Sequence, residues 1–389
     1  MTSRPAFLDG NRVTLLETGQ AYFPALEQAI RAAQSDVILE TYIFQDDRVG
    51  RQIVAALADA AARNVQVRVL VDGFGSQAFV TSLMPHLQAA GVLVMVFRRE
   101  IRRLALRRHR LRRLHRKLVL IDGKTAFVGG INIIDDFDAT APRHPRHDYA
   151  VRLEGPLVAQ VQASMERLWR HVRWAQIRRR PRPAEPPPAA STPAGQIRAA
   201  FVIRDNLRHR RDIEESYLEA IRAARREIIL ANAYFLPGRR FRQALVEAAR
   251  RGVRITLLLQ GRVEYVLQHY ATQALYPHFL AHGIRIYEYM PSFLHAKVAV
   301  IDDQWATVGS SNIDPFSLLL AREANVVIAD QGFARALHAR LKIAIQTDAI
   351  PLRAQEWERR PLVARVASWA AYSLVRFALG LTGYGGRNL

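Results

Sequence analysis

Two copies of one pattern of reactive residues occur in this chain of 389 residues. The first copy, HRKLVLIDGKTAFVGGIN, begins at His115, and the second, HAKVAVIDDQWATVGSSN, begins at His295. Five residue types recur at the same spacing, and each pair is 180 positions apart: His115 and His295, Lys117 and Lys297, Asp122 and Asp302, Gly129 and Gly309, Asn132 and Asn312. A single histidine and lysine on a strand are usually only solvated or paired, but two matched copies favour a functional interpretation.

The shared residue types suit the chemistry of a phosphate ester. An imidazole can attack phosphorus or transfer a proton near neutral pH, while lysine and asparagine side chains can stabilise charge on the nonbridging oxygens. Residues 118–121 and 298–301 are apolar and read as buried strands, so the histidine and lysine of each copy share one strand face. If the two halves face each other, the sequence predicts one phosphate pocket lined by both copies.

The choice of lysine supports this interpretation. Among 56 basic residues only four are lysines, and two of these four occupy the matched motif positions: Lys117, Lys124, Lys297 and Lys342. An ammonium is a compact charge on a flexible stem and does not replace a planar guanidinium. Lysine in a chain that otherwise uses arginine therefore indicates a chemical requirement at these two positions.

The paired motif, HxKxxxxDxxxxxxGxxN, resembles that of the phospholipase D superfamily. The chain from GNRVTLLETG near its start to GLTGYGG near its end is similar to the bacterial cardiolipin synthase B type. The resemblance implies an α/β fold of two tandem phospholipase D-like α-β-α sandwich domains related by internal duplication, with the active site at their interface. It also implies a covalent phosphohistidine, and with lysines and asparagines stabilising charge we expect neither a metal nor another cofactor.

The resemblance implies roles for single residues. Six motif residues form the expected catalytic set: His115, Lys117, Asp122, His295, Lys297 and Asp302. Within this set His115 is the expected nucleophile and His295 the acid and base, although the sequence is symmetric enough to allow the reverse. Asp122 and Asp302 are expected to brace the motif. Three further residues are expected to bind substrate, namely Asn132, Asn312 and Ser310.

Ser310 stands where the first copy has Gly130. Its hydroxyl either donates to phosphate or only fills space. An acid also follows each motif: Asp148 comes 33 residues after His115, and Glu323 comes 28 residues after His295. Each carboxylate can accept the Nδ1 proton of the histidine in its own half and leave Nε2 free to react. The resemblance implies this orienting role, and an ordinary surface acid at a strand end is the alternative.

The duplication extends beyond the motifs. AIRAAQSDVILETYIF, from Ala29, matches AIRAARREIILANAYF, from Ala220, and both read as a helix followed by a buried strand. The alternation of strands and helices predicts a largely parallel sheet with helices on both faces. We expect a first domain, a proline-rich linker, a second domain and a C-terminal tail that contacts membrane, over residues 1–177, 178–196, 197–350 and 351–389.

The first half contains an insertion before its motif. Gly91 precedes His115 by 24 residues, whereas Gly283 precedes His295 by only 12. The additional residues lie within 98–113, a densely basic segment. It is either a solvated charged arm or an arm that gathers anionic lipid beside the site.

The composition restricts the location and the partners. A net charge of +21 attracts polyanions, either nucleic acid or an anionic membrane. The chain has no cysteine, and its N-terminus lacks the apolar core of a secretory signal. In residues 361–384, four polar residues share one stripe of a helical pattern, and two arginines favour an interfacial helix over a spanning one: Arg365, Ser368, Tyr372 and Arg376. We expect a peripheral protein on the cytoplasmic face of the bacterial inner membrane.

The expected reaction is cardiolipin synthesis, in which a phosphatidyl group passes from one phosphatidylglycerol to another and glycerol is released. The expected partners are anionic phospholipid and the membrane surface, nucleic acid is not expected, and the oligomeric state is open. Hydrolysis to phosphatidic acid is an alternative, because acceptor choice depends on pocket shape and water exclusion. A nuclease is a weaker alternative, since an apolar C-terminal helix would have no purpose there. A non-catalytic binding protein would be indicated by loss of a motif residue, and none is lost.

Overall fold

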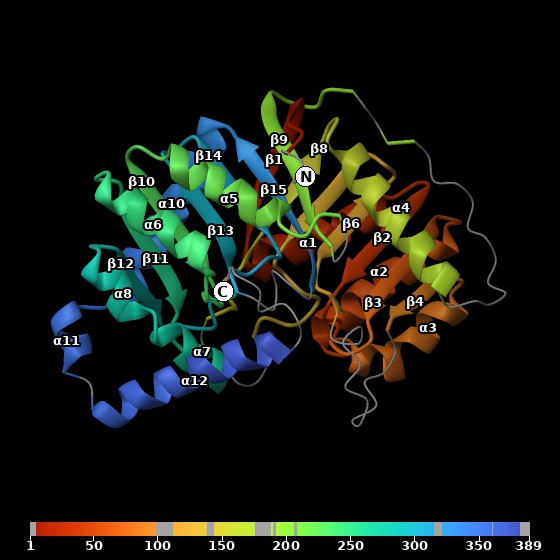
Figure 1. Cartoon of the computed structure of the whole chain (residues 1–389). Coiled ribbons are helices and arrows are strands. Elements are labelled where there is room, and N and C mark those ends of the chain that lie inside the picture. Colours follow the sequence, from red (N-terminus) through yellow and green to blue (C-terminus); the bar gives the residue numbers. More distant parts are fainter. Residues whose placement is uncertain are drawn as a thin grey trace.

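The computed structural model describes residues 5–98, 112–137, 144–175, 188–189, 192–205, 208–314, 321–359 and 361–381 (Figure 1). Three sequence expectations therefore lie partly or largely outside the described residues. These concern the basic segment at 99–111, most of the linker at 178–196, and the end of the tail beyond residue 381.

The first half alternates strands and helices before its motif strands. Its elements are β1 (Leu8–Glu17), α1 (Thr18–Ala32), β2 (Asp36–Thr41), α2 (Arg48–Ala62), β3 (Gln66–Asp72), a π-helical turn (Phe79–Leu83), α3 (Met84–Ala89), β4 (Leu93–Phe97), β5 (Arg113–Leu114), β6 (Lys117–Ile121), β7 (Thr125–Gly129), β8 (Tyr149–Glu154) and α4 (Val158–Ala175).

The second half repeats most of this order and then adds a short strand and further helices at its end. Its elements are β9 (Ile197–Arg204), α5 (Asp212–Ala223), β10 (Glu227–Asn232), α6 (Arg239–Arg250), β11 (Arg254–Gln260), α7 (Val266–Gln273), α8 (Tyr276–Ala281), β12 (Arg285–Tyr289), β13 (Lys297–Ile301), β14 (Trp305–Gly309), β15 (Ala321–Ala329), α10 (Gln331–Thr347), β16 (Ala349–Pro351), α11 (Ala354–Glu358) and α12 (Leu362–Leu381).

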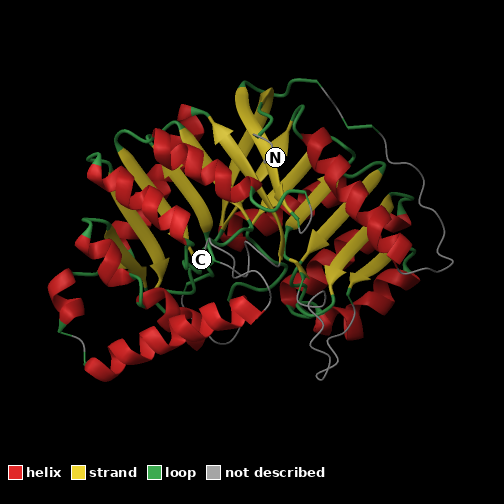
Figure 2. Cartoon of the chain, viewed as in Figure 1, coloured by secondary structure: helices red, strands yellow, loops and turns green. Residues whose placement is uncertain are grey.

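One sheet runs through both halves (Figure 2). Its strand order is β16-β12-β11-β10-β13-β14-β15-β9-β1-β8-β7-β6-β2-β3-β4, with β5 paired to β15 beside this path. The antiparallel pair β1 and β9 lies where the two halves meet. From this pair toward each edge of the sheet, the strands of the two halves follow in the same order. The expected α/β fold of two duplicated halves is therefore confirmed. The domain boundaries stay predictions.

The sheet is mixed, which corrects the expectation of a largely parallel sheet. Strands β2, β3 and β4 are parallel, as are β10, β11 and β12, but the motif strands form antiparallel hairpins. The reason lies in the turn that follows each motif strand. Asp122 and Gly123 both have positive φ, as do Asp302 and Asp303. Two successive residues of positive φ are typical of a tight hairpin turn, and only three residues separate the paired ends of the strands in each hairpin.

Helices cover both faces of the sheet, as an α-β-α sandwich requires. One face has separate cores in the two halves, under α1, α2 and α3 in the first and under α5, α6 and α8 in the second. On the other face, α4 and α10 contribute to one hydrophobic cluster that contains strands of both halves. The two halves are thus joined by a common core as well as by the sheet.

The described residues contain no helix with both the length and the apolar character needed to cross a bilayer.

Candidate active site

The first motif begins at the junction of the two halves. Strand β5, which directly precedes His115, pairs in parallel with β15 of the second half. The backbone N–H of His115 donates to the carbonyl of Arg322 at 3.0 Å. His115 is therefore positioned by backbone that belongs to the other half.

The second motif begins in the same way. Leu294 forms a parallel bridge with His147 of the first half, and the backbone N–H of His295 donates to the His147 carbonyl at 2.8 Å. This reciprocal pairing brings both motifs to one place at the junction.

Each histidine contacts an acid of the opposite half. Nδ1 of His115 lies 2.9 and 3.1 Å from the two carboxylate oxygens of Glu323, and Nδ1 of His295 lies 2.6 Å from Asp148. Sequence spacing had assigned each acid to the histidine of its own half, and the structure corrects this. Backbone pairing across the junction carries each acid to the opposite motif. Because a carboxylate accepts, Nδ1 carries the proton and Nε2 keeps its lone pair.

A buried lysine accompanies each histidine, on the first residue of strands β6 and β13. Lys117 Nζ donates to the carbonyl of His115 at 2.6 Å. Lys297 Nζ lies 3.4 Å from Asp148 and 2.7 Å from Nδ1 of His295. Burial lowers the pKa of Lys117 to about 7, against the opposing effect of Glu323. Burial likewise lowers the pKa of Lys297 to about 8, and Asp148 opposes that shift.

The imidazoles are also affected by burial. Burial lowers the pKa of His115, with Glu323 acting in the opposite direction and Lys117 adding to the decrease. The pKa of His295 is lowered further, well below its usual value, first by burial and then by the charge of Lys297. Both histidines are therefore neutral at neutral pH before substrate binds.

The asparagines and Ser310 are all buried, but their hydrogen bonds differ. Asn132 and Asn312 are buried, and the Oδ1 of Asn132 accepts from the backbone N–H of Ile43 at 3.1 Å. The Ser310 hydroxyl is also buried, but it donates to Glu323 at 2.5 Å. The Ser310 hydroxyl is thus directed to the acid that contacts His115, and a contact between Ser310 and phosphate stays a prediction.

The glycine that replaces this serine in the first motif is required by the other acid. A Cβ atom on Gly130 would lie only 2.3 Å from a carboxylate oxygen of Asp148. The two motifs therefore fit their acids in different ways. Ser310 adds a hydrogen bond to Glu323, whereas Gly130 leaves space for Asp148.

The motif aspartates lie at the far end of the motif strands. Asp122 accepts from the backbone N–H groups of residues 34–36, at the start of β2, and Asp302 accepts from those of residues 225–227, at the start of β10. Burial alone would raise the pKa of Asp122, but these backbone donors outweigh it and hold the pKa below the usual value. Both side chains thus connect a hairpin turn to the start of the adjacent strand.

Sequence reasoning missed four residues around the histidines. The ring of Tyr42 lies 4.8 Å from the imidazole of His115 and 5.5 Å from Lys117 Nζ. Near His295, Arg146 forms an ion pair with Glu264 at 3.1 Å, and the hydroxyl of Tyr234 donates to the same acid at 2.5 Å. Two of them could have been found, because Tyr42 and Tyr234 follow the carboxyl ends of β2 and β10, where α/β sheets form binding sites.

Within the described parts of the chain, no group of three or more histidine, cysteine, aspartate or glutamate side chains is arranged to hold a metal ion.

Comparison with known proteins agrees with this geometry. A family model described as "Cardiolipin synthase, PLD-like domain" matches residues 26–169 and 217–343, one match in each half. The chain is 42% identical over 350 residues to Cardiolipin synthase B of Escherichia coli strain K12, covering 87% of this chain and 82% of that protein. It is 39% identical over 386 residues to Cardiolipin synthase B of Salmonella typhi, covering 97% and 90%.

The fold is similar to the crystal structure of phosphatidylserine synthase from Haemophilus influenzae Rd KW20. The TM-score is 0.71 at 12% sequence identity, and the match covers 95% of this chain and 96% of that one. The duplicated fold and the paired motifs thus define a phospholipase D-like protein. Within that class, the chain belongs to the family of PLD-like cardiolipin synthase domains.

Proposed function

We propose that the protein is a phosphatidyltransferase that makes cardiolipin and glycerol from two molecules of phosphatidylglycerol. The observation that carries this proposal is the pair of histidines at one junction, each held at Nδ1 by a buried acid and each accompanied by a buried lysine. The relatives named cardiolipin synthase B support the choice of substrate.

The first step is attack on phosphorus by the Nε2 of His115. A phosphorus–nitrogen bond forms, and the bond from phosphorus to the headgroup glycerol oxygen breaks. His295 gives that oxygen a proton, and glycerol leaves. Binding of the phosphodiester anion favours the protonated form of His295, because a negative charge close to the imidazole raises its pKa.

The second step reverses the proton transfer with a new acceptor. His295 takes the proton from the terminal hydroxyl of a second phosphatidylglycerol, and that oxygen attacks phosphorus. The phosphorus–nitrogen bond breaks, which restores His115 and releases cardiolipin. His115 is assigned as the nucleophile because its side chain is 15% exposed, compared with 9% for His295.

The lysines and asparagines stabilise the charge that develops on the nonbridging oxygens. Lys117 and Lys297 are suited to this task because an ammonium in a buried site acts with little screening by water. Asp148 and Glu323 act as positioning residues that fix the tautomer of the opposite histidine. Asp122 and Asp302 keep each motif hairpin in register with the neighbouring strand.

We also propose that the protein binds peripherally to the cytoplasmic face of the inner membrane through α12. This helix has six large apolar side chains that are between 55% and 81% exposed: Leu362, Val363, Val366, Trp369, Leu374 and Phe377. An exposed apolar face of this extent is unfavourable in water and suits the boundary between headgroups and acyl chains.

Product analysis tests the proposed reaction. Purified protein is incubated with labelled phosphatidylglycerol in mixed micelles without added metal, beside His115→Ala and His295→Ala. His86→Ala, at an exposed position of α3, is the matched control. The expected products are cardiolipin and free glycerol, lost in both site variants and retained in the control. Phosphatidic acid alone would show a hydrolase, and unchanged lipid with cleaved nucleic acid would show a nuclease.

A further inference from the structure

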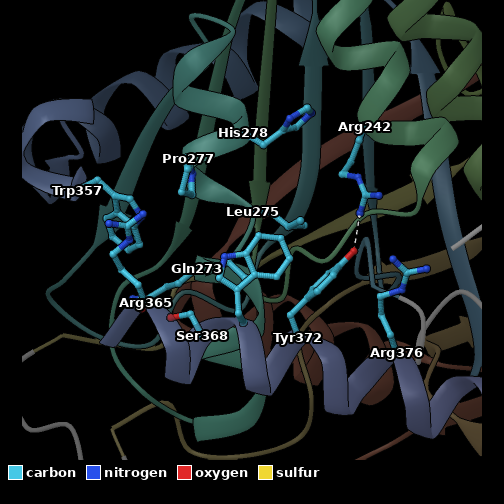
Figure 3. A pocket seen from close by; sticks show the side chains of 12 residues that line it. Arg242, Gln273, Leu275, Pro277, His278, Trp357, Arg365, Ser368, Tyr372 and Arg376 are labelled. Atoms are coloured by element: carbon cyan, nitrogen blue, oxygen red, sulfur yellow. Dashed lines mark hydrogen bonds between the residues drawn. The ribbon is translucent and has the colours of Figure 1, made fainter. Parts of the chain in front are cut away.

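A cavity of about 540 Å³ lies in the second half between α12 and the helices α6 and α8 (Figure 3). It contains none of the motif residues or their acids. Its described walls combine arginines with aromatic side chains and include no carboxylate: Arg242, Arg365, Arg376, Trp357, Trp369 and Tyr372. The cavity is thus positively charged and largely apolar at the same time.

The cavity is covered by the polar side of α12. Arg365, Ser368, Tyr372 and Arg376 lie on one side of the helix and line the cavity, as Figure 3 shows. Arg242 of α6 donates to the Tyr372 hydroxyl at 3.1 Å, and the Arg376 guanidinium lies 5.7 Å from the centre of the Tyr372 ring. Ser368 and Tyr372 are therefore buried against the protein, whereas Arg365 and Arg376 line the cavity and remain exposed to solvent.

Helix α12 buries Tyr372 and Val375 against the second half, but its exposed side is unusually apolar for a surface helix. A helix packed on a soluble protein usually turns its apolar side inward and its polar side to water. In α12 most of the large exposed side chains are apolar, and the adjacent segment at the start of α7 also exposes four apolar side chains: Val263, Tyr265, Val266 and Leu267. A ligand whose charged part fits the cavity and whose apolar part follows the outer side of α12 matches both surfaces.

We propose that this cavity binds the headgroup of an anionic phospholipid at a site separate from the two histidines. Guanidinium groups bind phosphate oxygens through paired hydrogen bonds, and tryptophan and tyrosine suit the headgroup region of a bilayer. The acyl chains extend into the bilayer along the apolar face of α12. The bound lipid thus fixes the position of α12 on the membrane.

This inference rests on the proposed membrane contact of α12 and is independent of the transferase chemistry. The probe is dihexanoyl phosphatidylglycerol, kept monomeric and titrated into full-length His115→Ala protein, in which the proposed nucleophile is absent. Trp357 and Trp369 report binding because both line the cavity. We expect a saturable change in tryptophan emission that is lost in the Trp357→Phe, Trp369→Phe double variant. Dihexanoyl phosphatidylcholine is expected to give no such change.

Three double variants locate the site. Arg365→Gln with Arg376→Gln is expected to weaken binding roughly tenfold or more, because each arginine makes a charge-assisted contact to phosphate. Arg167→Gln with Arg170→Gln removes the same charge from exposed positions of α4 and is expected to leave binding unchanged. Arg365→Lys with Arg376→Lys keeps both charges and should retain most of the affinity.

Unchanged affinity in the glutamine variant, equal loss in the glutamine and lysine variants, or an equal response to phosphatidylcholine would overturn the proposal. Sedimentation with phosphatidylglycerol vesicles separates this failure from failure of membrane contact. If only the cavity site is wrong, the unaltered chain sediments with vesicles but shows no saturable response. If membrane contact is wrong, the unaltered chain does not sediment.

Discussion

The two acid–histidine pairs are equivalent in position but differ in their surroundings. Glu323 contacts His115 and also accepts a hydrogen bond from the Ser310 hydroxyl, which is a neutral donor. Asp148 contacts His295 and lies beside the ammonium of Lys297. Environments that differ in this way separate the proton affinities of two otherwise similar imidazoles, which a reaction needs if one attacks and the other transfers protons.

The pairing across the junction predicts specific effects of removing each acid. Glu323→Gln should reduce turnover roughly 100-fold to 10,000-fold, because the histidine loses its preferred tautomer. Nitrogen NMR of the imidazoles should show an altered tautomer at His115 and an unchanged one at His295. Asp148→Asn is the matched control and should show the reverse. A Glu323→Gln protein whose change appears at His295 would contradict the pairing.

The buried ammonium of Lys117 predicts a dependence of stability on pH. Its pKa in the folded protein is about 7, below the ordinary value of 10.5, so the unfolded chain binds this proton more tightly. The free energy of unfolding should therefore rise with pH between these two values. Between pH 7 and pH 9, Lys117 contributes a rise of about 2 kcal/mol.

Lys117→Met removes this titration while keeping the length of the side chain. Urea unfolding of both proteins at pH 7 and pH 9 measures the effect, and the increase with pH should be smaller in the variant by that amount. Lys124→Met, in the exposed hairpin turn, is the control and should behave as the unaltered chain. Equal pH dependence in all three proteins would show that Lys117 is not buried as an ammonium.

At the scale of elements, the sequence predicted what repeats along the chain and missed what depends on pairing between strands. The motif strands and the two halves were predictable, because a buried strand and a duplication both leave a pattern in the sequence. The partners of Asp148 and Glu323 were not predictable, because they depend on β5 crossing to β15 and on the bridge between His147 and Leu294. The hydrogen bond from Ser310 to Glu323 was missed for the same reason, since its acceptor comes from another strand.

Helix α12 gives a prediction about the membrane. Leu374→Gln with Phe377→Gln makes the exposed side of the helix polar without touching the cavity side. Sedimentation with vesicles containing phosphatidylglycerol should show roughly tenfold weaker binding, since two apolar side chains no longer leave water. Ile343→Gln changes an exposed apolar residue of α10 and should bind as the unaltered chain does. Equal binding of all three proteins would show that α12 does not enter the interface.

At the scale of the whole molecule, the site belongs to both halves and to neither alone. One sheet and one hydrophobic cluster continue across the junction, so the halves are not two units that move freely. Each motif histidine takes its backbone hydrogen bond and its acid from the other half. A rigid junction keeps the two imidazoles at a fixed separation during attack and release, as a reaction through a covalent intermediate requires.

A mixture of two inactive variants tests whether the two halves of one chain form the whole site. His115→Ala and His295→Ala each lack one histidine, and a site built from the two halves of one chain cannot be completed by mixing them. Lipid product analysis of the mixture should therefore show no cardiolipin. Unaltered protein mixed with an excess of His115→Ala is the control and should keep its own activity. Activity recovered on mixing the two variants would show that halves exchange between chains.

The crossed contacts also have a consequence for the order of events during synthesis. Glu323 lies 208 residues beyond His115, and His295 lies 147 residues beyond Asp148. A ribosome therefore completes the first motif long before the acid that holds its histidine exists. Until β9 arrives, β1 presents an unpaired edge, which can associate with other chains. The nascent first half therefore lacks a complete active site and is prone to aggregation. Both conditions end when the second half pairs with it.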